Sequence, residues 1–209
     1  MIIRHLGHAS FRINLKDGTS IVTDPYDENV GFAMPSTPAD IVTISHEHHD
    51  HNFIGQLAPK HVIRGTEQAQ FSGLTIEGFA TFHDDVSGAK RGKNTVYLFE
   101  AEGLRVLHLG DLGHMPGDDL IENLLPIDVL MIPVGGVFTI DAEMAAELTH
   151  RFGARITVPM HYSEPALSFG LGSLQAYLDA VDMPYERKFE LDPNASASSI
   201  VVLESGNGL

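Results

Sequence analysis

Cysteine and tryptophan are both absent from this chain of 209 residues. Without cysteine the protein has no disulfide, no thiolate ligand for a metal and no thiol nucleophile, and the composition fits a reducing compartment. Without tryptophan, and with only 8% aromatic residues, a ligand pocket must be walled by Phe, Tyr, Met and aliphatic side chains. The absence of cysteine excludes thiol chemistry before any motif is considered.

Basic residues are scarce: 13 Lys and Arg stand against 28 Asp and Glu, which gives a net charge of −15. Proteins that bind nucleic acid without specificity neutralise phosphates with Lys and Arg, so this balance counts against a nucleic-acid partner. Bound divalent cations offset the charge locally, so a nuclease is disfavoured and not excluded. We expect a small-molecule substrate.

Long apolar runs are also missing. A membrane-spanning helix needs at least ~18 consecutive apolar residues, and the most apolar stretch, Val129–Ile140, is interrupted by Pro133. The N-terminus carries Arg4, His5 and His8 and is typical of a strand, not of a signal peptide. We therefore expect a cytoplasmic protein without a membrane span.

The remaining pattern predicts one α/β domain over residues 1–209. Short apolar and β-branched segments bounded by turn residues indicate strands, over Met1–Leu6, Ser10–Leu15, Thr19–Thr23, Asp40–Ser45, His61–Arg64, Leu74–Phe82, Thr95–Glu100, Leu104–Leu109, Asp128–Ile132, Arg155–Val158, Tyr185–Leu191 and Ser199–Leu203. Helices are expected over Asn52–Leu57, Ala142–Phe152 (N-cap Asp141, stopped by Gly153) and Leu171–Val181. This order favours two sheets packed face to face with helices outside.

Histidine is the residue that stands out. Four of the twelve histidines, His46, His48, His49 and His51, fall within six residues directly after a predicted buried strand. A strand that ends in an abrupt turn presents consecutive side chains around one point, where a metal can collect several of them. Imidazole and carboxylate suit Zn²⁺ and neighbouring divalent metals. The alternative, a solvated histidine-rich loop, fits poorly with a segment joined to an Ile-Val-Thr-Ile strand.

The segment His46-Glu47-His48-His49-Asp50-His51 resembles the signature motif of the metallo-β-lactamase superfamily. Other landmarks of that superfamily follow in order at predicted strand ends, namely Asp24-Pro25, Phe82-His83-Asp84, Leu109-Gly110-Asp111 and Pro159-Met160-His161-Tyr162. The resemblance covers nearly the whole chain. It implies the four-layer αβ/βα sandwich of the metallo-β-lactamase type.

The resemblance also implies a site with two divalent metals, zinc in the first place, with manganese or iron as alternatives. One metal would be held by His46, His48 and His83. The second would be held by Asp50, His51 and His161, and Asp111 would bridge the two. Two such cations hold a bridging water and lower its pKa from ~16 towards ~7, which supplies a hydroxide nucleophile at neutral pH.

Three carboxylates are expected to have further roles in the site. Asp50 and Asp111 are the candidate catalytic residues, and Asp50 is the better placed to accept or shuttle a proton. Asp24 is expected to accept a hydrogen bond from the free N–H of a ligand imidazole. Each late candidate follows a predicted strand, so all of them can meet at one rim of the sandwich.

A finer resemblance is to the branch of L-ascorbate-6-phosphate lactonase-like and uncharacterised metal-dependent hydrolases. The segments Leu6–Phe11, Ile132–Ile140 and Val158–Tyr162 are similar to that branch. One departure is Leu112, where the branch commonly has Thr. Position 48 is His and not the Glu of flavodiiron oxygen reductases, which favours hydrolysis over redox chemistry.

We therefore expect a metal-dependent, lactonase-like hydrolase that acts on a small-molecule ester, lactone or phosphoester. One alternative is a phosphodiesterase or ribonuclease-like member of the same superfamily, although such members usually carry an extra arm or domain. The other is a non-catalytic metal-binding member, whose expected sign, loss of metal ligands, is absent. The walls that decide the substrate come from loops such as Tyr26–Pro38 and Ser163–Gly170.

Other polar residues have two interpretations each. His8 follows a glycine at a strand break, and a substrate contact and a plain turn histidine are equally favoured. His49 is expected to face away from the site. His108 and His114 flank Asp111 and are expected to be structural, the alternative being that one of them reaches the substrate. Arg91 lies in the loop from Ser87 to Asn94, interpreted as solvated, the alternative being a cap that meets an anionic group.

Overall fold

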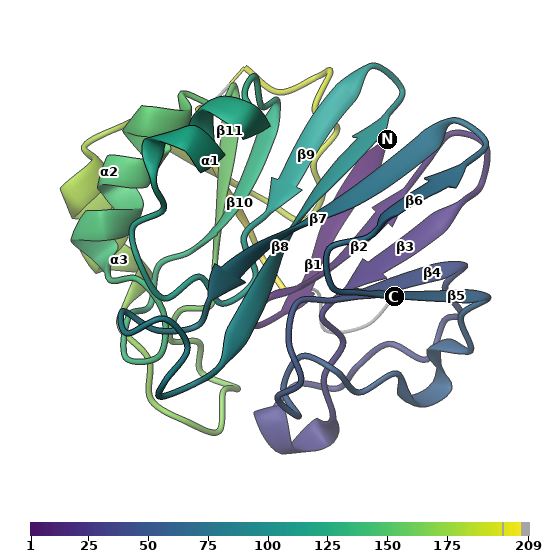
Figure 1. The fold of residues 1–209 in the computed structure, drawn as a ribbon, viewed down its shortest axis with the longest axis horizontal. Coiled ribbons are helices and arrows are strands. Elements are labelled where there is room, and N and C mark those ends of the chain that lie inside the picture. The colour runs from purple at the N-terminus through teal and green to yellow at the C-terminus, as the bar shows by residue number, and fades with distance from the viewer. Residues whose placement is uncertain (198, 206–209) are drawn as a thin grey trace.

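The computed structural model describes residues 1–197 and 199–205, which form two sheets packed face to face (Figure 1). The first sheet has five strands in the order β1-β2-β3-β4-β5, namely β1 (Ile2–Gly7), β2 (Ser10–Asn14), β3 (Ser20–Thr23), β4 (Ile41–Ile44) and β5 (His61–Arg64). The β1–β2 and β2–β3 pairs are antiparallel, and β3, β4 and β5 are parallel.

The second sheet has eight strands in the order β12-β13-β11-β10-β9-β8-β7-β6. Its strands are β6 (Gln68–Phe71), β7 (Leu74–Phe82), β8 (Lys93–Ala101), β9 (Leu104–His108), β10 (Val129–Pro133), β11 (Ile156–Met160), β12 (Tyr185–Lys188) and β13 (Ile200–Leu203). The meander from β6 to β9 is antiparallel, and the strands from β9 to β12 are parallel. The predicted α/β sandwich is therefore the observed fold.

The core lies in two layers. Apolar side chains from both sheets, among them Ile3, Phe11, Tyr97 and Met131, pack between the sheets. A second core lies between the eight-stranded sheet and the three helices, α1 (Asp118–Leu124), α2 (Ala142–Phe152) and α3 (Leu174–Val181), which gather on one side of the molecule (Figure 1). Removing these apolar side chains from water is the main force that fixes the sandwich.

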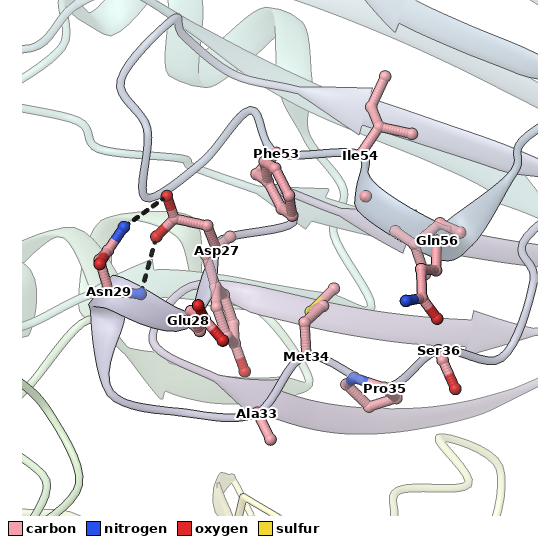
Figure 2. A pocket seen from close by; sticks show the side chains of 13 residues that line it. Asp27, Glu28, Asn29, Ala33, Met34, Pro35, Ser36, Phe53, Ile54 and Gln56 are labelled. Carbon is pink, nitrogen blue, oxygen red and sulfur yellow. Dashed lines mark hydrogen bonds between the residues drawn. The ribbon is translucent and has the colours of Figure 1, made fainter.

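The outer face of the five-stranded sheet is covered differently. Among the described residues it carries loops and two 3₁₀ turns, η1 (Glu28–Val30) and η2 (Gly55–Leu57), over a small apolar cluster that contains Val22, Val42 and Leu57. A cavity of about 530 Å³ opens between these loops, and in it Asp27 turns toward Asn29, which it holds through two hydrogen bonds (Figure 2). The outer layer on this side is thus made of loops.

Several boundaries differ from the sequence prediction. Helix α2 begins and ends as predicted, with the Asp141 carboxylate accepting a hydrogen bond from Met144 N and Gly153 in the left-handed region. Helix α3 begins at Leu174 instead of Leu171, because Ser173 caps it. The predicted helix Asn52–Leu57 is only the 3₁₀ turn η2.

Two elements were missed by the sequence prediction. Strand β6 is mostly polar and lies at the sheet edge, and α1 spans only seven residues, too few for a clear helical period. The closing strand β12 ends at Lys188, three residues before the predicted Leu191. Among residues 1–197 and 199–205, no helix combines the length and apolar character that crossing a membrane requires.

Candidate metal centre

The predicted site residues come from strand ends at one edge of the sandwich. In the five-stranded sheet, Asp24 follows β3 and the histidine motif follows β4, and these two strands are parallel. In the other sheet, His83, Asp111 and His161 follow β7, β9 and β11. Strands β7 and β9 are both antiparallel to β8, so they point the same way, and β9, β10 and β11 are parallel. The strands that precede site residues therefore end at the same rim, and the first site residue follows each of them within three positions.

The first group of side chains at this rim is His46, His48 and His83. One ring nitrogen from each lies within 4.8 Å of the other two. His46 and His83 are buried, whereas His48 is exposed. The three rings surround one point, which is the geometry that a single metal ion requires.

The second group consists of His51, His161 and His8, again with one ring nitrogen from each within 4.8 Å of the others. Asp50 lies beside this group, with Oδ2 at 3.3 Å from Nε2 of His8 and 3.7 Å from Nε2 of His51. The structure thus places His8 in the turn after β1, at a backbone φ of 56°, with its ring inside the cluster, and His8 is not among the residues that line the pocket.

Asp111 lies between the two groups. Its Oδ2 atom is 3.2 Å from Nε2 of His83, 3.2 Å from Nε2 of His161 and 3.3 Å from Nε2 of His51. The same oxygen is 3.9 Å from Nε2 of His46. One carboxylate oxygen therefore faces nitrogens of both groups at once.

A residue that the sequence did not single out, Asn94, positions Asp111. Its side-chain oxygen accepts a hydrogen bond from Asp111 N at 3.0 Å, and its side-chain nitrogen donates to Leu109 O at 2.9 Å and to Thr81 Oγ1 at 2.8 Å. The chain turns at Gly110 with a φ of 54°, and a Cβ atom there would lie 2.5 Å from Asn94 Oδ1. Glycine is required so that the turn packs directly on Asn94.

Asp24 organises the other side of the cluster. Its carboxylate accepts hydrogen bonds from Ser45 N at 2.8 Å and from Ser45 Oγ at 2.5 Å, and Oδ2 lies 3.0 Å from Nδ1 of His51. Ser45 Oγ also lies 2.9 Å from Nδ1 of His46. Because both Nδ1 atoms are engaged from behind, the Nε2 atoms of His46 and His51 are left facing Asp111. This is the position predicted for Asp24.

Most of the pKa shifts fit a metal-binding cluster. His51 is the exception, because the effect of burial is outweighed by Asp111 and Asp24, which raise the pKa of His51 well above its usual value. Burial, assisted by the nearby His161, lowers the pKa of His8 to about 3, and burial together with His51 lowers the pKa of His46 to about 3. Burial acts against a charge on Asp111 as well, but His161 and His51 outweigh it and hold the pKa of Asp111 well below its usual range. Neutral imidazole and ionised carboxylate are the forms that bind metals.

Several buried polar atoms of the cluster have no hydrogen-bond partner among the described residues. They include Nε2 of His46, Nε2 of His51 and Oδ1 of Asp111. A buried polar atom without a partner carries a desolvation penalty of ~1–3 kcal/mol. Several such atoms at one point therefore indicate that a ligand binds there. The donor set of imidazole and carboxylate groups fits divalent zinc, manganese or iron.

Two further histidines near the site, His108 and His114, make structural hydrogen bonds. His108 is buried, with Nε2 at 2.9 Å from Ala9 O and Nδ1 accepting from Gly110 N. His114 accepts a hydrogen bond from Phe82 N. His49 is exposed, with 68% of its side-chain surface accessible, but it lines the pocket and so does not face away from the site as expected. Leu112, the departure from the branch pattern, is buried in the core under the helices.

The cluster opens into a pocket of about 370 Å³. On the metal side it is lined by His48, His49, Asp50, His83 and Asp111, and on the other side by Arg91, Phe138 and Phe169. Arg91 therefore forms part of the pocket wall, whereas Ser87, Ala89, Lys90 and Lys93 of the same loop are exposed to solvent, as the interpretation of a solvated loop expects. The cavity of Figure 2 is separate, because none of the cluster residues lines it.

Comparison with known proteins agrees with this geometry. The family described as Beta-lactamase superfamily domain matches residues 2–161, and the chain belongs to the metallo-β-lactamase superfamily. Within the superfamily it falls with the UPF0173 metal-dependent hydrolases. A UPF0173 protein of Pyrococcus abyssi is 31% identical over 196 residues, covering 82% of this chain and 86% of the relative. A UPF0173 metal-dependent hydrolase of Methanoculleus marisnigri is 29% identical over 186 residues, covering 78% and 81%.

Solved structures show the same fold. A protein of Thermotoga maritima, assigned to the Zn-dependent hydrolases of the superfamily, is 36% identical, with a TM-score of 0.79 and 97% of each chain covered. A metallo hydrolase of Ignicoccus hospitalis superposes with a TM-score of 0.71 at 22% identity, over 99% of this chain and 96% of that one. The second similarity concerns the fold alone.

Proposed function

We propose that this protein is a dinuclear metal hydrolase of small-molecule esters, lactones or phosphoesters. The observation that carries the proposal is the position of Asp111, whose Oδ2 atom lies 3.2–3.3 Å from imidazole nitrogens belonging to both histidine groups. A carboxylate in that position suits two cations better than one. Zinc is the metal that we expect first, and manganese and iron fit the same donors.

The residues divide between the two cations as the superfamily motif implies, although the spacing itself groups His8 with His51 and His161. His46, His48 and His83 would hold one metal, and His51, His161 and Asp50 the other, with Asp111 shared between them. When bound, such a pair of cations lowers the pKa of water and stabilises negative charge that develops on an attacked carbonyl or phosphoryl group. Relatives named as metal-dependent hydrolases support this chemistry.

The protein's own residues have distinct parts in the reaction. Asp50 lines the pocket, and although burial raises its pKa, the contacts with His8 and His51 outweigh it and hold the pKa well below its usual range. Asp50 is therefore ionised at neutral pH and able to accept a proton at Oδ2. His8 lies 3.3 Å from that oxygen, where it positions the carboxylate.

A small molecule is a better substrate for this site than a nucleic acid. The net charge is −15, and six of the eight arginines are paired with carboxylates, namely Arg4, Arg64, Arg105, Arg151, Arg155 and Arg187. Few cations are thus left to neutralise phosphates along a strand. The pocket of about 370 Å³ has the volume of a small-ligand site.

The proposal is tested by screening metal-reconstituted protein against esters, lactones and phosphodiesters, with Asp111→Asn as the inactivating variant and Asp118→Asn, on the exposed start of α1, as its control. We expect Asp111→Asn to lower kcat/KM at least ~100-fold on any substrate that is turned over. Asp118→Asn should have the kcat/KM of the wild-type protein. Unchanged turnover in Asp111→Asn would remove its proposed role. Nanomolar, salt-sensitive RNA binding would overturn the preference for a small molecule.

A further inference from the structure

Arg91 is an exception among the arginines of this acidic protein. Six of the eight have a carboxylate partner, and Arg12 is buried and bound to Ser20 Oγ, Thr37 O and Pro38 O. Among residues 1–197 and 199–205, Arg91 has no carboxylate within 4.0 Å. Its contacts are one long hydrogen bond, 3.4 Å to Val137 O, and the ring of Phe138, 5.1 Å from its guanidinium carbon.

The loop that carries Arg91 is fixed directly behind a predicted metal ligand. The carboxylate of Asp84, the residue after His83, accepts four backbone hydrogen bonds of 2.7–3.0 Å from this loop. Two of them come from Lys90 N and Arg91 N. A cation that is held this firmly at a pocket wall, but without a counter-charge, is arranged for a ligand that supplies one.

The two aromatic walls of the pocket lie beside this cation. Phe138 lies under Arg91 and has its ring centroid 6.3 Å from that of Phe169. Phe169 in turn meets the ring of His8 edge-on at 5.4 Å, so the aromatic wall reaches the metal cluster. Phe138 is 36% exposed despite its size, which fits a surface that a ligand covers.

We propose that the substrate is a small ester or lactone with an anionic group, a carboxylate or a phosphate, that binds Arg91, and an apolar body that packs between Phe138 and Phe169. This rests on the proposed hydrolase function, because the scissile bond would face the metal side of the pocket. Arginine presents a planar fork of N–H donors that matches both anions, and stacking on Phe138 leaves the edge of the fork free. Arg91 thus determines specificity, and Asp84 positions it.

The subsite is tested by calorimetric titration of zinc-loaded protein with benzoate, phenylphosphonate and neutral benzamide. Arg91→Gln should weaken binding of one or both anions by roughly 10- to 100-fold, the range of a lost charge-assisted hydrogen bond, and change benzamide binding far less. Whichever anion loses more identifies the group that Arg91 takes. Lys90→Gln is the matched control, since it removes the same charge from the same loop, where Lys90 pairs with Asp85.

The apolar walls Phe138 and Phe169 are tested by comparing the binding of an aromatic and a small aliphatic carboxylate. Benzoate should bind more tightly than acetate to the wild-type protein, and Phe169→Ala should reduce that preference by roughly 3- to 30-fold, as expected for lost apolar burial. An Arg91→Gln protein that binds both anions as the wild type does would overturn the Arg91 subsite, and so would equal losses for anions and benzamide, the pattern of a merely structural contact with Val137.

Failure of this inference is distinguishable from failure of the proposed function. If the protein hydrolyses a substrate but its anion binding does not change in Arg91→Gln, the Arg91 subsite is contradicted and the proposed hydrolase function stands. If the metal-loaded protein binds anions through Arg91 but hydrolyses no ester, lactone or phosphoester, the proposed hydrolase function is contradicted and the Arg91 subsite stands.

Discussion

The carboxylate of Asp24 and the ring of His51 form a hydrogen-bonded pair with 3.0 Å between Oδ2 and Nδ1, buried at the base of the cluster. The pair sets which nitrogen of His51 faces the site. Asp24 itself is fixed by Ser45, which donates to it from both backbone and side chain. The carboxylate therefore orients a predicted metal ligand without approaching the pocket.

Asp24→Asn tests this orientation. The amide keeps the shape and tolerates the left-handed backbone at this position, where φ is 40°, but its NH₂ group cannot accept from His51. We expect metal affinity to fall roughly 10- to 100-fold, in line with the loss of such a partner in other metal sites. Chelator competition measures the affinity, with Asp27→Asn, in the same loop but outside the cluster, as the control. Equal affinities in the two variants would contradict the role of Asp24.

Asn94→Ala tests the positioning of Asp111 from the opposite sheet. The substitution removes three hydrogen bonds in a buried location and leaves Asp111 N, Leu109 O and Thr81 Oγ1 without their partner. We expect the free energy of unfolding to fall by roughly 2–4 kcal/mol, and metal affinity to fall with it. Denaturant unfolding of the metal-free protein measures the first effect. Asn123→Ala, on the exposed face of α1, should change neither quantity, and an Asn94→Ala protein as stable as that control would refute the argument.

Asp84→Asn tests the loop behind Arg91, and its effect depends on pH. Burial raises the pKa of Asp84, but N–H donors from Arg91, Val86, Gly88 and Lys90 outweigh it and hold the pKa well below the usual range. A carboxyl group whose pKa is depressed by folding stabilises the protein fully above its unfolded pKa of ~3.9, and this stability is lost as the pH falls towards the folded pKa.

The stability difference between wild type and Asp84→Asn should therefore be constant from pH 7 to pH 5 and shrink as the pH falls below ~4. Unfolding of the chelator-treated proteins across that range measures it. Asp85→Asn is the control, because the carboxylate of Asp85 is exposed and pairs with the side chain of Lys90. A difference that grows on acidification would contradict the assignment of these hydrogen bonds.

Much of the site could be predicted because it lies at strand ends. The histidine motif follows β4, and His83, Asp111 and His161 follow β7, β9 and β11, so sequence order together with strand direction brings them to one rim. The local signals for α2 were equally clear, since Asp141 and Gly153 mark its two ends.

What could not be predicted depends on contacts between distant segments. Asn94 and Asp111 are separated by 17 positions, and nothing local to Asn94 indicates that its amide holds the turn at Gly110. The position of Arg91 at the pocket wall follows from the four bonds to Asp84, which no periodicity reveals. The loop Tyr26–Pro38 was expected, but its packing over the outer face of the five-stranded sheet was not, because the apolar residues there are few and irregularly spaced.

The most direct test of the two-metal centre is a metal count by mass spectrometry on protein stripped with chelator, reloaded with zinc and freed of excess ion. The arrangement around Asp111 predicts two zinc ions per chain in the wild-type protein, and about one fewer in His161→Ala, whose ring belongs to the second group alone. A wild-type protein that retains at most one ion per chain would contradict the dinuclear centre.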